Sequence, residues 1–135
     1  MIELQIENTN VCNAHCIWCP YREHTRKRQH MGMDLFRKII DEAETIPLIE
    51  RIIITGLGEP TLDPGLFDKI AYTRKTMQKR TQIDVYTNGS TITDEMVGKF
   101  RKSGTTTLYV SVNAVDALKR KEVMGLDDYE RIEPV

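Results

Sequence analysis

Strand-like and helix-like segments alternate along this chain, and that alternation constrains its fold more than any other feature. Residues 2–7 alternate apolar and polar side chains, as a strand with one buried face does. The run 52–55 is short and β-branched, which is typical of a strand buried on both faces. Two further strands are predicted over 82–87 and 107–112, and helices over 34–45, 64–77 and 93–103, with the start of a fourth over 115–123.

Turn and capping residues set the expected ends of the helices. Asp34 is expected at the start of the first helix, and Asp63 is expected to cap the second, with Pro64 in its first turn. Thr93 is expected to open the third helix and Gly104 to end it. The last dozen residues are expected to form a turn and a partly amphipathic segment.

Alternation of this kind implies parallel strands joined by right-handed crossovers, so the predicted class is α/β. The 135 residues are enough for one domain, over 1–135. About four βα units are too few to close an eight-stranded barrel, so the barrel is incomplete. The uncovered strand at 107–112 would be a pairing liability. We expect it to be covered through self-association or by sequence of a longer protein.

The only three cysteines, Cys12, Cys16 and Cys19, lie in a predicted loop over 8–32. Loops of this length inside a compact domain are usually functional or disordered. An odd number of closely spaced cysteines, in a chain that does not begin with a signal peptide, argues for metal or cluster binding and for a reducing cytoplasm. Three thiolates on a [4Fe–4S] cube leave one iron open, which favours chemistry over electron storage.

A zinc site is the alternative interpretation of the cysteines. It would combine the three thiolates with one histidine from His15, His24 or His30. A spacing of three and then two residues is unusual for zinc.

Charge and hydropathy exclude two classes of partner. The formal net charge is −1, which indicates neither nucleic acid nor an anionic membrane, and no apolar run is long enough to span a bilayer. One local exception is the basic run over 22–30, which is either a solvated loop or an anion-binding segment.

Polar and glycine-rich motifs follow the later strands. They are Gly-Leu-Gly-Glu-Pro over 56–60, Tyr-Thr-Asn-Gly over 86–89, and the pair Ser111 and Asn113, expected on one face of a strand. Each has an ordinary explanation taken alone, since Gly, Pro and Asn-Gly are common at turns and polar residues are common at strand ends. All of them fall at the carboxyl ends of strands, where parallel βα proteins bind ligands.

Together these motifs resemble those of the radical S-adenosylmethionine (SAM) superfamily. The C-x3-C-x2-C spacing, with Trp18 before the third cysteine, resembles the family's cluster loop. Segment 56–60 is similar to its Gly-Gly-Glu-Pro segment, although Leu57 replaces one glycine, and 86–89 is similar to its Thr-Asn-Gly turn. Segment 110–113 resembles the fourth-strand segment that faces the SAM ribose. The stretch 19–36 is similar to the branch that carries a SPASM domain, and the resemblance runs from residue 2 to about 126.

The resemblance implies a partial TIM barrel of about six βα units, of which this chain holds the N-terminal part. Cys12, Cys16 and Cys19 would bind three irons of a [4Fe–4S] cluster, and the fourth iron would take the amino and carboxylate groups of SAM. One electron from the cluster would then cleave the S–C5′ bond and release methionine and a 5′-deoxyadenosyl radical. Glu59 would pair with the SAM ammonium, and the backbone near Gly58 would accept a hydrogen bond from it.

The remaining contacts implied by the resemblance concern the SAM carboxylate, ribose and adenine. Asn88 is expected at the carboxylate or ribose, and Ser111 and Asn113 at ribose oxygens. Trp18 is expected to flank the adenine, with a buried core position as its alternative. No residue is predicted to be catalytic in its own right.

The leading hypothesis is a radical SAM enzyme, or the N-terminal part of one, that abstracts hydrogen from a peptide or small-molecule substrate. Its electron donor would be a flavodoxin- or ferredoxin-like reductant. One alternative is a non-catalytic cluster- or zinc-binding module that acts through a partner. Another is a truncated barrel that binds the cluster without turnover, since the family's fifth and sixth strands add further SAM and substrate contacts.

Overall fold

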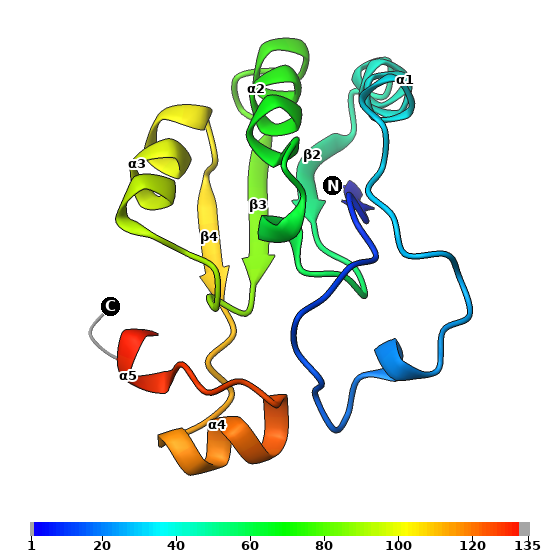
Figure 1. Cartoon of the computed structure of the whole chain (residues 1–135). Coiled ribbons are helices and arrows are strands. Elements are labelled where there is room, and N and C mark those ends of the chain that lie inside the picture. Colours follow the sequence, from blue (N-terminus) through cyan, green and yellow to red (C-terminus); the bar gives the residue numbers. More distant parts are fainter. Residues whose placement is uncertain (1, 133–135) are drawn as a thin grey trace.

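The computed structural model describes residues 2–132 and contains one parallel sheet of four strands in the order β1-β2-β3-β4. Helices follow the strands in the expected alternation (Figure 1), which confirms the α/β prediction; the sheet is not closed. The strands are β1 (Ile2–Ile6), β2 (Ile49–Ile54), β3 (Gln82–Thr87) and β4 (Thr107–Val110). The helices are α1 (Met33–Glu44), α2 (Leu66–Thr76), α3 (Asp94–Ser103), α4 (Ala117–Met124) and α5 (Tyr129–Ile132), with 3-10 turns η1 (Pro20–Arg22) and η2 (Pro60–Leu62).

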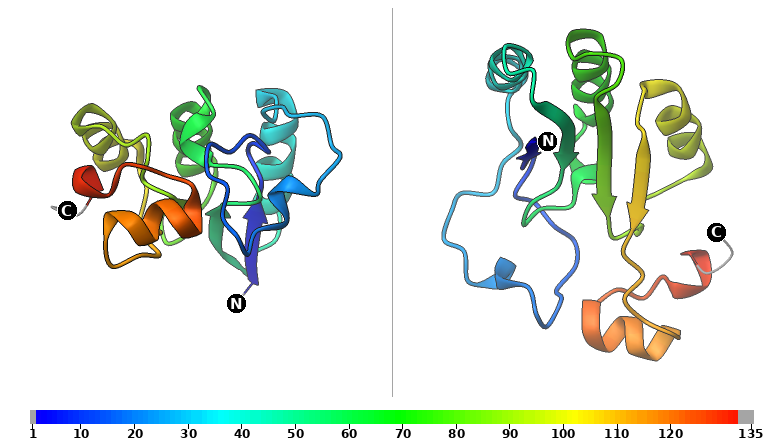
Figure 2. Two further views of the ribbon diagram at one scale, coloured as in Figure 1. Left: turned by 60° about the horizontal axis from the view of Figure 1, so that its bottom comes forward. Right: turned by 180° about the vertical axis from the view of Figure 1, so that it is seen from behind.

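Helices α1, α2 and α3 cover one face of the sheet (Figures 1 and 2). Their apolar residues bury the alternate side chains of the strands, because successive strand residues point to opposite faces. Phe36 and Ile40 of α1 pack with Ile52 of β2. A second group joins Ile54, Leu66, Ile70, Ile83, Val85 and Phe100. Across residues 2–132, none of the helices combines the length and the apolar character that a membrane crossing requires.

The opposite face of the sheet is polar and aromatic. Arg51 lies between Glu3, at 2.8 Å, and the buried carboxylate of Asp84, at 3.0 Å. Tyr86 and Tyr109, which are in register on neighbouring strands, stack with ring centroids 4.4 Å apart. The prediction of a strand buried on both faces over 52–55 was therefore wrong for one face, because Ile52 and Ile54 are buried whereas Ile53, which points to the opposite face, is only partly buried.

Helix ends follow the expected capping in part. Thr93 caps α3 by accepting from the Met96 N–H, and Gly104 ends it with a φ of 92°. By contrast, Gly32 and not Asp34 precedes α1. Helix α2 starts at Leu66, because Asp63 accepts from the Gly65 N–H in the turn before the helix and does not cap the helix itself.

Asp63 belongs to a buried polar cluster that joins the ends of β1 and β2 to α2. Its carboxylate accepts from the Lys69 ammonium at 2.5 Å and from the Asn8 amide at 2.9 Å. Asn8 also donates to the Pro60 carbonyl at 3.3 Å. All three charged or polar side chains are almost fully buried. The cluster fixes the turn η2, and thereby the residue just before it, Glu59.

Substituting Lys69→Met tests the contribution of this buried polar cluster to stability. Loss of the ammonium leaves a buried carboxylate without its counter-charge, so we expect the free energy of unfolding to fall by about 3–5 kcal/mol. Urea unfolding measures the change. Lys75→Met, at an exposed position of the same helix, should change stability by no more than about 0.5 kcal/mol. Equal stability of the two variants would contradict a role for the buried pair.

Candidate cofactor site

The carboxyl ends of the four strands deliver the sequence motifs to one pocket of about 300 Å³. The long loop between β1 and α1 and the helix α4 both lie beyond this edge of the sheet (Figure 1). The pocket is lined by Cys12, Ala14, Cys16, Trp18, Cys19, Pro20, Thr55, Gly56, Leu57, Gly58, Glu59, Tyr86, Thr87, Asn88, Ser111, Asn113 and Met124. The structure therefore brings together all nine residues that the sequence analysis assigned to cluster and SAM.

The three cysteines are free thiols and partly exposed. The Cys12 N–H donates to the Tyr21 hydroxyl at 3.0 Å, and the Cys19 N–H donates to the Cys16 carbonyl at 3.1 Å. Tyr21 itself is buried, although it was not expected to take part in the site. The loop is therefore held by its own buried aromatic ring as well as by the sheet.

Helix α4 holds the cysteine loop from the other side. The N–H groups of His15 and Ile17 donate to the carbonyls of Met124 and Val123, at 2.8 and 3.0 Å. Val123 and Met124 also form an apolar cluster with Ala14 and Leu126, against which Cys12 and Cys16 pack. The last turn of α4 thus supplies acceptors to the loop, which is a ready use for carbonyls that have no partner inside the helix.

The surroundings of the cysteines favour the neutral thiol in the absence of a cation. Burial raises the pKa of Cys12, and the negative charges of Glu59 and the other cysteines act in the same direction. Burial and the proximity of Cys19 likewise raise the pKa of Cys16. A bound metal centre reverses this preference, since metal ligation deprotonates the thiol.

Within residues 2–132, no three His, Cys, Asp or Glu side chains converge as closely as the ligands of a single metal ion do. A mononuclear zinc site needs four ligands around one ion. In a [4Fe–4S] cluster each thiolate binds a different iron, so this close convergence is not required. Three free thiols around one pocket fit the donor set of a cluster.

Glu59 is 3% exposed, and its carboxylate is the most highly bonded group of the pocket. One oxygen accepts from the Thr61 N–H at 3.1 Å and from the hydroxyls of Thr61 and Thr87, both at 2.6 Å. The other accepts from the Asn88 N–H at 2.7 Å. These donors take up most of the roughly four acceptor sites of a carboxylate. Glu59 therefore ties the turn after β2 to the end of β3, and its pairing with the SAM ammonium stays a prediction.

Gly58 allows two backbone segments to touch. A Cβ at this position would collide with the Thr9 carbonyl oxygen. The next residue, Glu59, donates its N–H to the Val11 carbonyl at 2.8 Å. The 56–60 segment is thus packed directly against the start of the cysteine loop, a contact that only glycine permits.

Asn88 is bonded within the protein through its side chain. Its amide nitrogen donates to the Asn13 side-chain oxygen at 2.9 Å, and its own oxygen accepts from the Ser90 N–H at 2.8 Å. Asn13 donates in turn to the Ser90 hydroxyl at 2.7 Å. Asn13, which follows Cys12, is therefore hydrogen-bonded to both sides of the Asn-Gly turn, where Gly89 has a φ of 77°.

The pocket is also lined by Ser111, Asn113 and Trp18. Their local structure differs in part from the prediction. Strand β4 ends at Val110, so Ser111 and Asn113 follow the strand and do not share one of its faces. Asn113 adopts a φ of 54°, a left-handed conformation that asparagine tolerates better than most residues. Trp18 is 55% exposed, so the alternative of a buried core position was wrong.

Arg120 of α4, fully buried, was not expected at the site. Its guanidinium donates to the carbonyls of Asn88, at 2.7 Å, and Val112, at 2.9 Å, and to the Asp128 carboxylate at 2.5 Å. One side chain thus joins the end of β3, the segment after β4 and helix α4. An arginine in a predicted helix carries no sequence signal for this role, since its acceptors are mostly backbone carbonyls.

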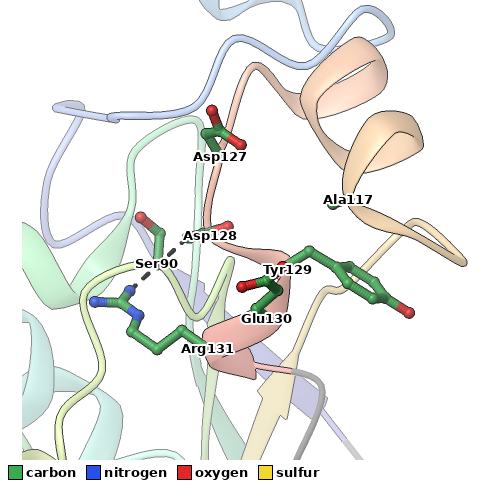
Figure 3. Close-up of a pocket in the computed structure, with 7 residues that line it drawn as sticks. All are labelled: Ser90, Ala117, Asp127, Asp128, Tyr129, Glu130 and Arg131. Atoms are coloured by element: carbon green, nitrogen blue, oxygen red, sulfur yellow. Dashed lines mark ion pairs between the residues drawn. The ribbon is translucent and has the colours of Figure 1, made fainter.

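A larger cavity of about 500 Å³ lies beside α5. It is lined by Ser90, Ala117 and residues 127–131, and Figure 3 shows the Arg131 guanidinium reaching the Asp128 carboxylate, at 3.8 Å. None of the residues that the motifs singled out lines this cavity. The residues from which the sequence predicts cofactor binding line the smaller, thiol-lined pocket instead.

Fold and site define a class: a parallel βα protein with a thiol-lined pocket at the carboxyl edge of its sheet. Residues 6–134 match the family model of the radical SAM superfamily. The chain belongs to the radical SAM superfamily. Members of this family use a [4Fe–4S] cluster and SAM, and the free cysteines and polar groups of the pocket fit both.

Two relatives illustrate the range of the family. The chain is 31% identical over 123 residues to the tungsten-containing aldehyde ferredoxin oxidoreductase cofactor-modifying protein of Pyrococcus furiosus, covering 90% of this chain and 33% of that protein. It is 33% identical over 134 residues to the GTP 3′,8-cyclase of Edwardsiella ictaluri, covering 96% and 39%. The chain thus spans between a third and two fifths of the length of these relatives.

Solved structures of the same fold agree. The structure of anSMEcpe with bound AdoMet superimposes with a TM-score of 0.79 at 19% identity, over 98% of this chain and 38% of that one. The structure of Streptococcus suis SuiB bound to precursor peptide SuiA gives 0.78 at 20% identity, over 97% and 28%. The strands described above are therefore part of a radical SAM partial TIM barrel.

Gly58→Ala tests the contact between the 56–60 turn and the cysteine loop. The added methyl group meets the Thr9 carbonyl, so the loop must move, at a cost of about 1–3 kcal/mol. We expect a lower midpoint of thermal unfolding and less iron bound after anaerobic reconstitution. Gly98→Ala, in α3 where nothing lies within 4 Å, should instead stabilise the helix by about 0.5–1 kcal/mol. Wild-type stability and iron content in Gly58→Ala would refute the contact.

Asp128→Asn tests the ion pair of Arg120. Burial alone would raise the pKa of Asp128, but the hydrogen bond and charge of Arg120 outweigh it and the pKa is lowered. The carboxylate therefore stabilises the fold above its unfolded pKa, about 3.9, and this contribution is lost as the pH falls through the lower folded value.

We expect Asp128→Asn to lose about 1.5–3 kcal/mol at pH 7, with the difference from wild type shrinking below about pH 4. Chemical unfolding across pH measures both. Asp127→Asn removes an exposed pair with Lys121 and should cost no more than about 1 kcal/mol. A difference that stays constant down to pH 2 would show that the Asp128 carboxylate is not responsible.

Proposed function

We propose that this chain forms the cluster- and SAM-binding part of a radical SAM enzyme. The observation that carries the proposal is the joint pocket: three free cysteines face Glu59, Asn88 and the segment after β4 across about 300 Å³. The cysteines come from one loop and the polar groups from the ends of three strands. Such convergence at the carboxyl edge is the usual arrangement of ligand sites in parallel βα proteins.

In this proposal Cys12, Cys16 and Cys19 hold three irons of the cluster as thiolates. A cluster held by these residues, together with SAM, would supply reductive cleavage of the sulfonium and formation of the radical. The protein positions the ligands and limits the access of water. Two contacts serve this positioning. Gly58 packs tightly against Thr9, and the last turn of α4 is hydrogen-bonded to the cysteine loop.

The polar residues are assigned to the SAM groups around the pocket. Glu59 supplies negative charge near the ammonium while its oxygens hold the turn, and the backbone at Gly58 accepts from the same ammonium. Asn88 lies beside the carboxylate or ribose, with its side chain kept in place by Asn13. Ser111 and Asn113 face the ribose.

Trp18 is assigned to the adenine. Its ring lies on the pocket wall and is exposed, so the adenine can stack on it. A ring buried in the core could not be reached.

The substrate class remains broad in this proposal: a peptide or a small molecule from which hydrogen is abstracted. The named relatives act on different kinds of molecule, and the chain spans at most two fifths of their length. We expect the open edge of β4 to be paired with further strands of a longer chain or with a second copy. The electron donor is a flavodoxin- or ferredoxin-like protein, and the free thiols are suited to a reducing cytoplasm.

Anaerobic reconstitution with iron and sulfide tests the proposal. We expect a brown protein with about four irons per chain, and 5′-deoxyadenosine after reduction in the presence of SAM. Cys16→Ala should lose the cluster, because each thiolate binds a different corner. The matched control is the triple variant His15→Ala, His24→Ala and His30→Ala, which should keep the iron because no histidine is a ligand.

The outcomes separate the alternatives left open by the sequence. A colourless protein with one zinc, lost in the histidine variant, would favour a zinc module. A full cluster without 5′-deoxyadenosine would favour a binding module or a barrel that needs further sequence. Full iron content in Cys16→Ala would overturn the ligand assignment itself.

A further inference from the structure

The loop that carries the cysteines also carries an unpaired positive surface. Arg22, Lys27 and Arg28 are exposed, and none of them forms an ion pair with any residue of 2–132. Arg26, in the same run, differs because it pairs with Glu7 at 2.5 Å. The chain as a whole has a formal net charge of −1. The positive charge of residues 22–28 is therefore a local feature, in the segment that follows Cys19.

Side-chain contacts join two of these cations, Arg28 and Arg22, to the cysteine segment. The Arg28 guanidinium lies over the Tyr21 ring, 5.2 Å from its centroid, and the Tyr21 hydroxyl accepts from the Cys12 N–H. Arg22 donates to the His15 carbonyl at 3.3 Å, between Cys12 and Cys16. The charged surface is thus attached to the cysteine segment itself and is not an independent arm.

The positive surface lies outside the thiol-lined pocket. Trp18 and Pro20 line the pocket, but none of residues 22–30 does. Figures 1 and 2 show this part of the loop, which follows η1, on the outer side, away from α4. Ile17, between two cysteines, is 71% exposed. A molecule bound to the cations would approach the cysteines from outside, while SAM and substrate occupy the pocket.

We propose, building on the assignment of a cluster to the cysteines, that Arg22, Lys27 and Arg28 form the docking surface for an acidic one-electron carrier protein. The reduced carrier loses one electron, the cluster gains it, and no bond forms or breaks in this step. Opposite charges raise the rate of encounter and orient the carrier, which suits a brief electron-transfer contact of small area. Cys16 and Cys19 are partly exposed and belong to the same loop as these cations.

The test compares two reductants on the reconstituted protein. The probe is a flavodoxin of strongly negative net charge, and dithionite is the small-molecule control. We expect the triple variant Arg22→Gln, Lys27→Gln and Arg28→Gln to slow reduction by flavodoxin about tenfold at low ionic strength. Dithionite should reduce wild type and variant at the same rate.

Matched controls and a second readout make the test decisive. Lys75→Gln, Lys79→Gln and Lys102→Gln remove the same charge from exposed positions toward the opposite edge of the sheet, and should leave flavodoxin reduction unchanged. The affinity for oxidised flavodoxin, measured by titration, should fall in the first variant alone. In wild type, the flavodoxin rate should decrease as salt is added, since screening weakens exposed charges.

Other outcomes would overturn the proposal. They are an unchanged flavodoxin rate in the first variant, an equal loss with dithionite, a salt-independent rate in wild type, or binding of polyglutamate as tight as that of flavodoxin. Absence of iron and of a cluster absorbance from the reconstituted wild type would instead show that the cluster assignment is wrong. The two failures are therefore distinguishable.

Discussion

The buried carboxylate of Glu59 is the interaction on which the pocket depends. It stands at the end of the turn after β2 and accepts from the backbone and hydroxyl of Thr61, the hydroxyl of Thr87 and the backbone of Asn88. A buried charge is costly unless it is fully hydrogen-bonded, and bonds to an ionised acceptor are stronger than neutral ones. The same contacts that solvate Glu59 therefore hold the ends of two neighbouring strands at a fixed separation.

Arg120 extends this framework to the cysteines. It bonds the carbonyl of Asn88, next to the N–H that Glu59 binds, and the carbonyl of Val112 beyond β4. The helix that carries Arg120 ends on Val123 and Met124, whose carbonyls receive the N–H groups of the cysteine loop. A negative centre and a positive centre, each hydrogen-bonded to both backbone groups and side chains, thus connect the strand ends to the loop. Preorganisation of this kind lets a site bind its cofactor without first ordering itself.

Much of the fold and the residue types of the site followed from the sequence, whereas their connections did not. Local signals were enough to predict the βα alternation and the cap at Thr93. They also predicted that the motifs lie together, because parallel strands end at one edge of the sheet. The Asn13–Asn88 bond spans 75 residues, and nothing in either local pattern indicates it. Arg120 acts on backbone carbonyls, which every residue has. Arg51 was missed because the pattern of β2 was judged from its apolar half alone.

The central claim is that three thiolates hold a [4Fe–4S] cluster whose fourth iron is open to SAM within this preorganised pocket. Electron paramagnetic resonance of the reconstituted, reduced protein, recorded with and without SAM, tests it most directly. An open iron inside the pocket predicts one reduced cluster signal whose g values change when SAM is added. A signal that SAM leaves unchanged, or no cluster signal in a protein that retains its iron, would contradict the account.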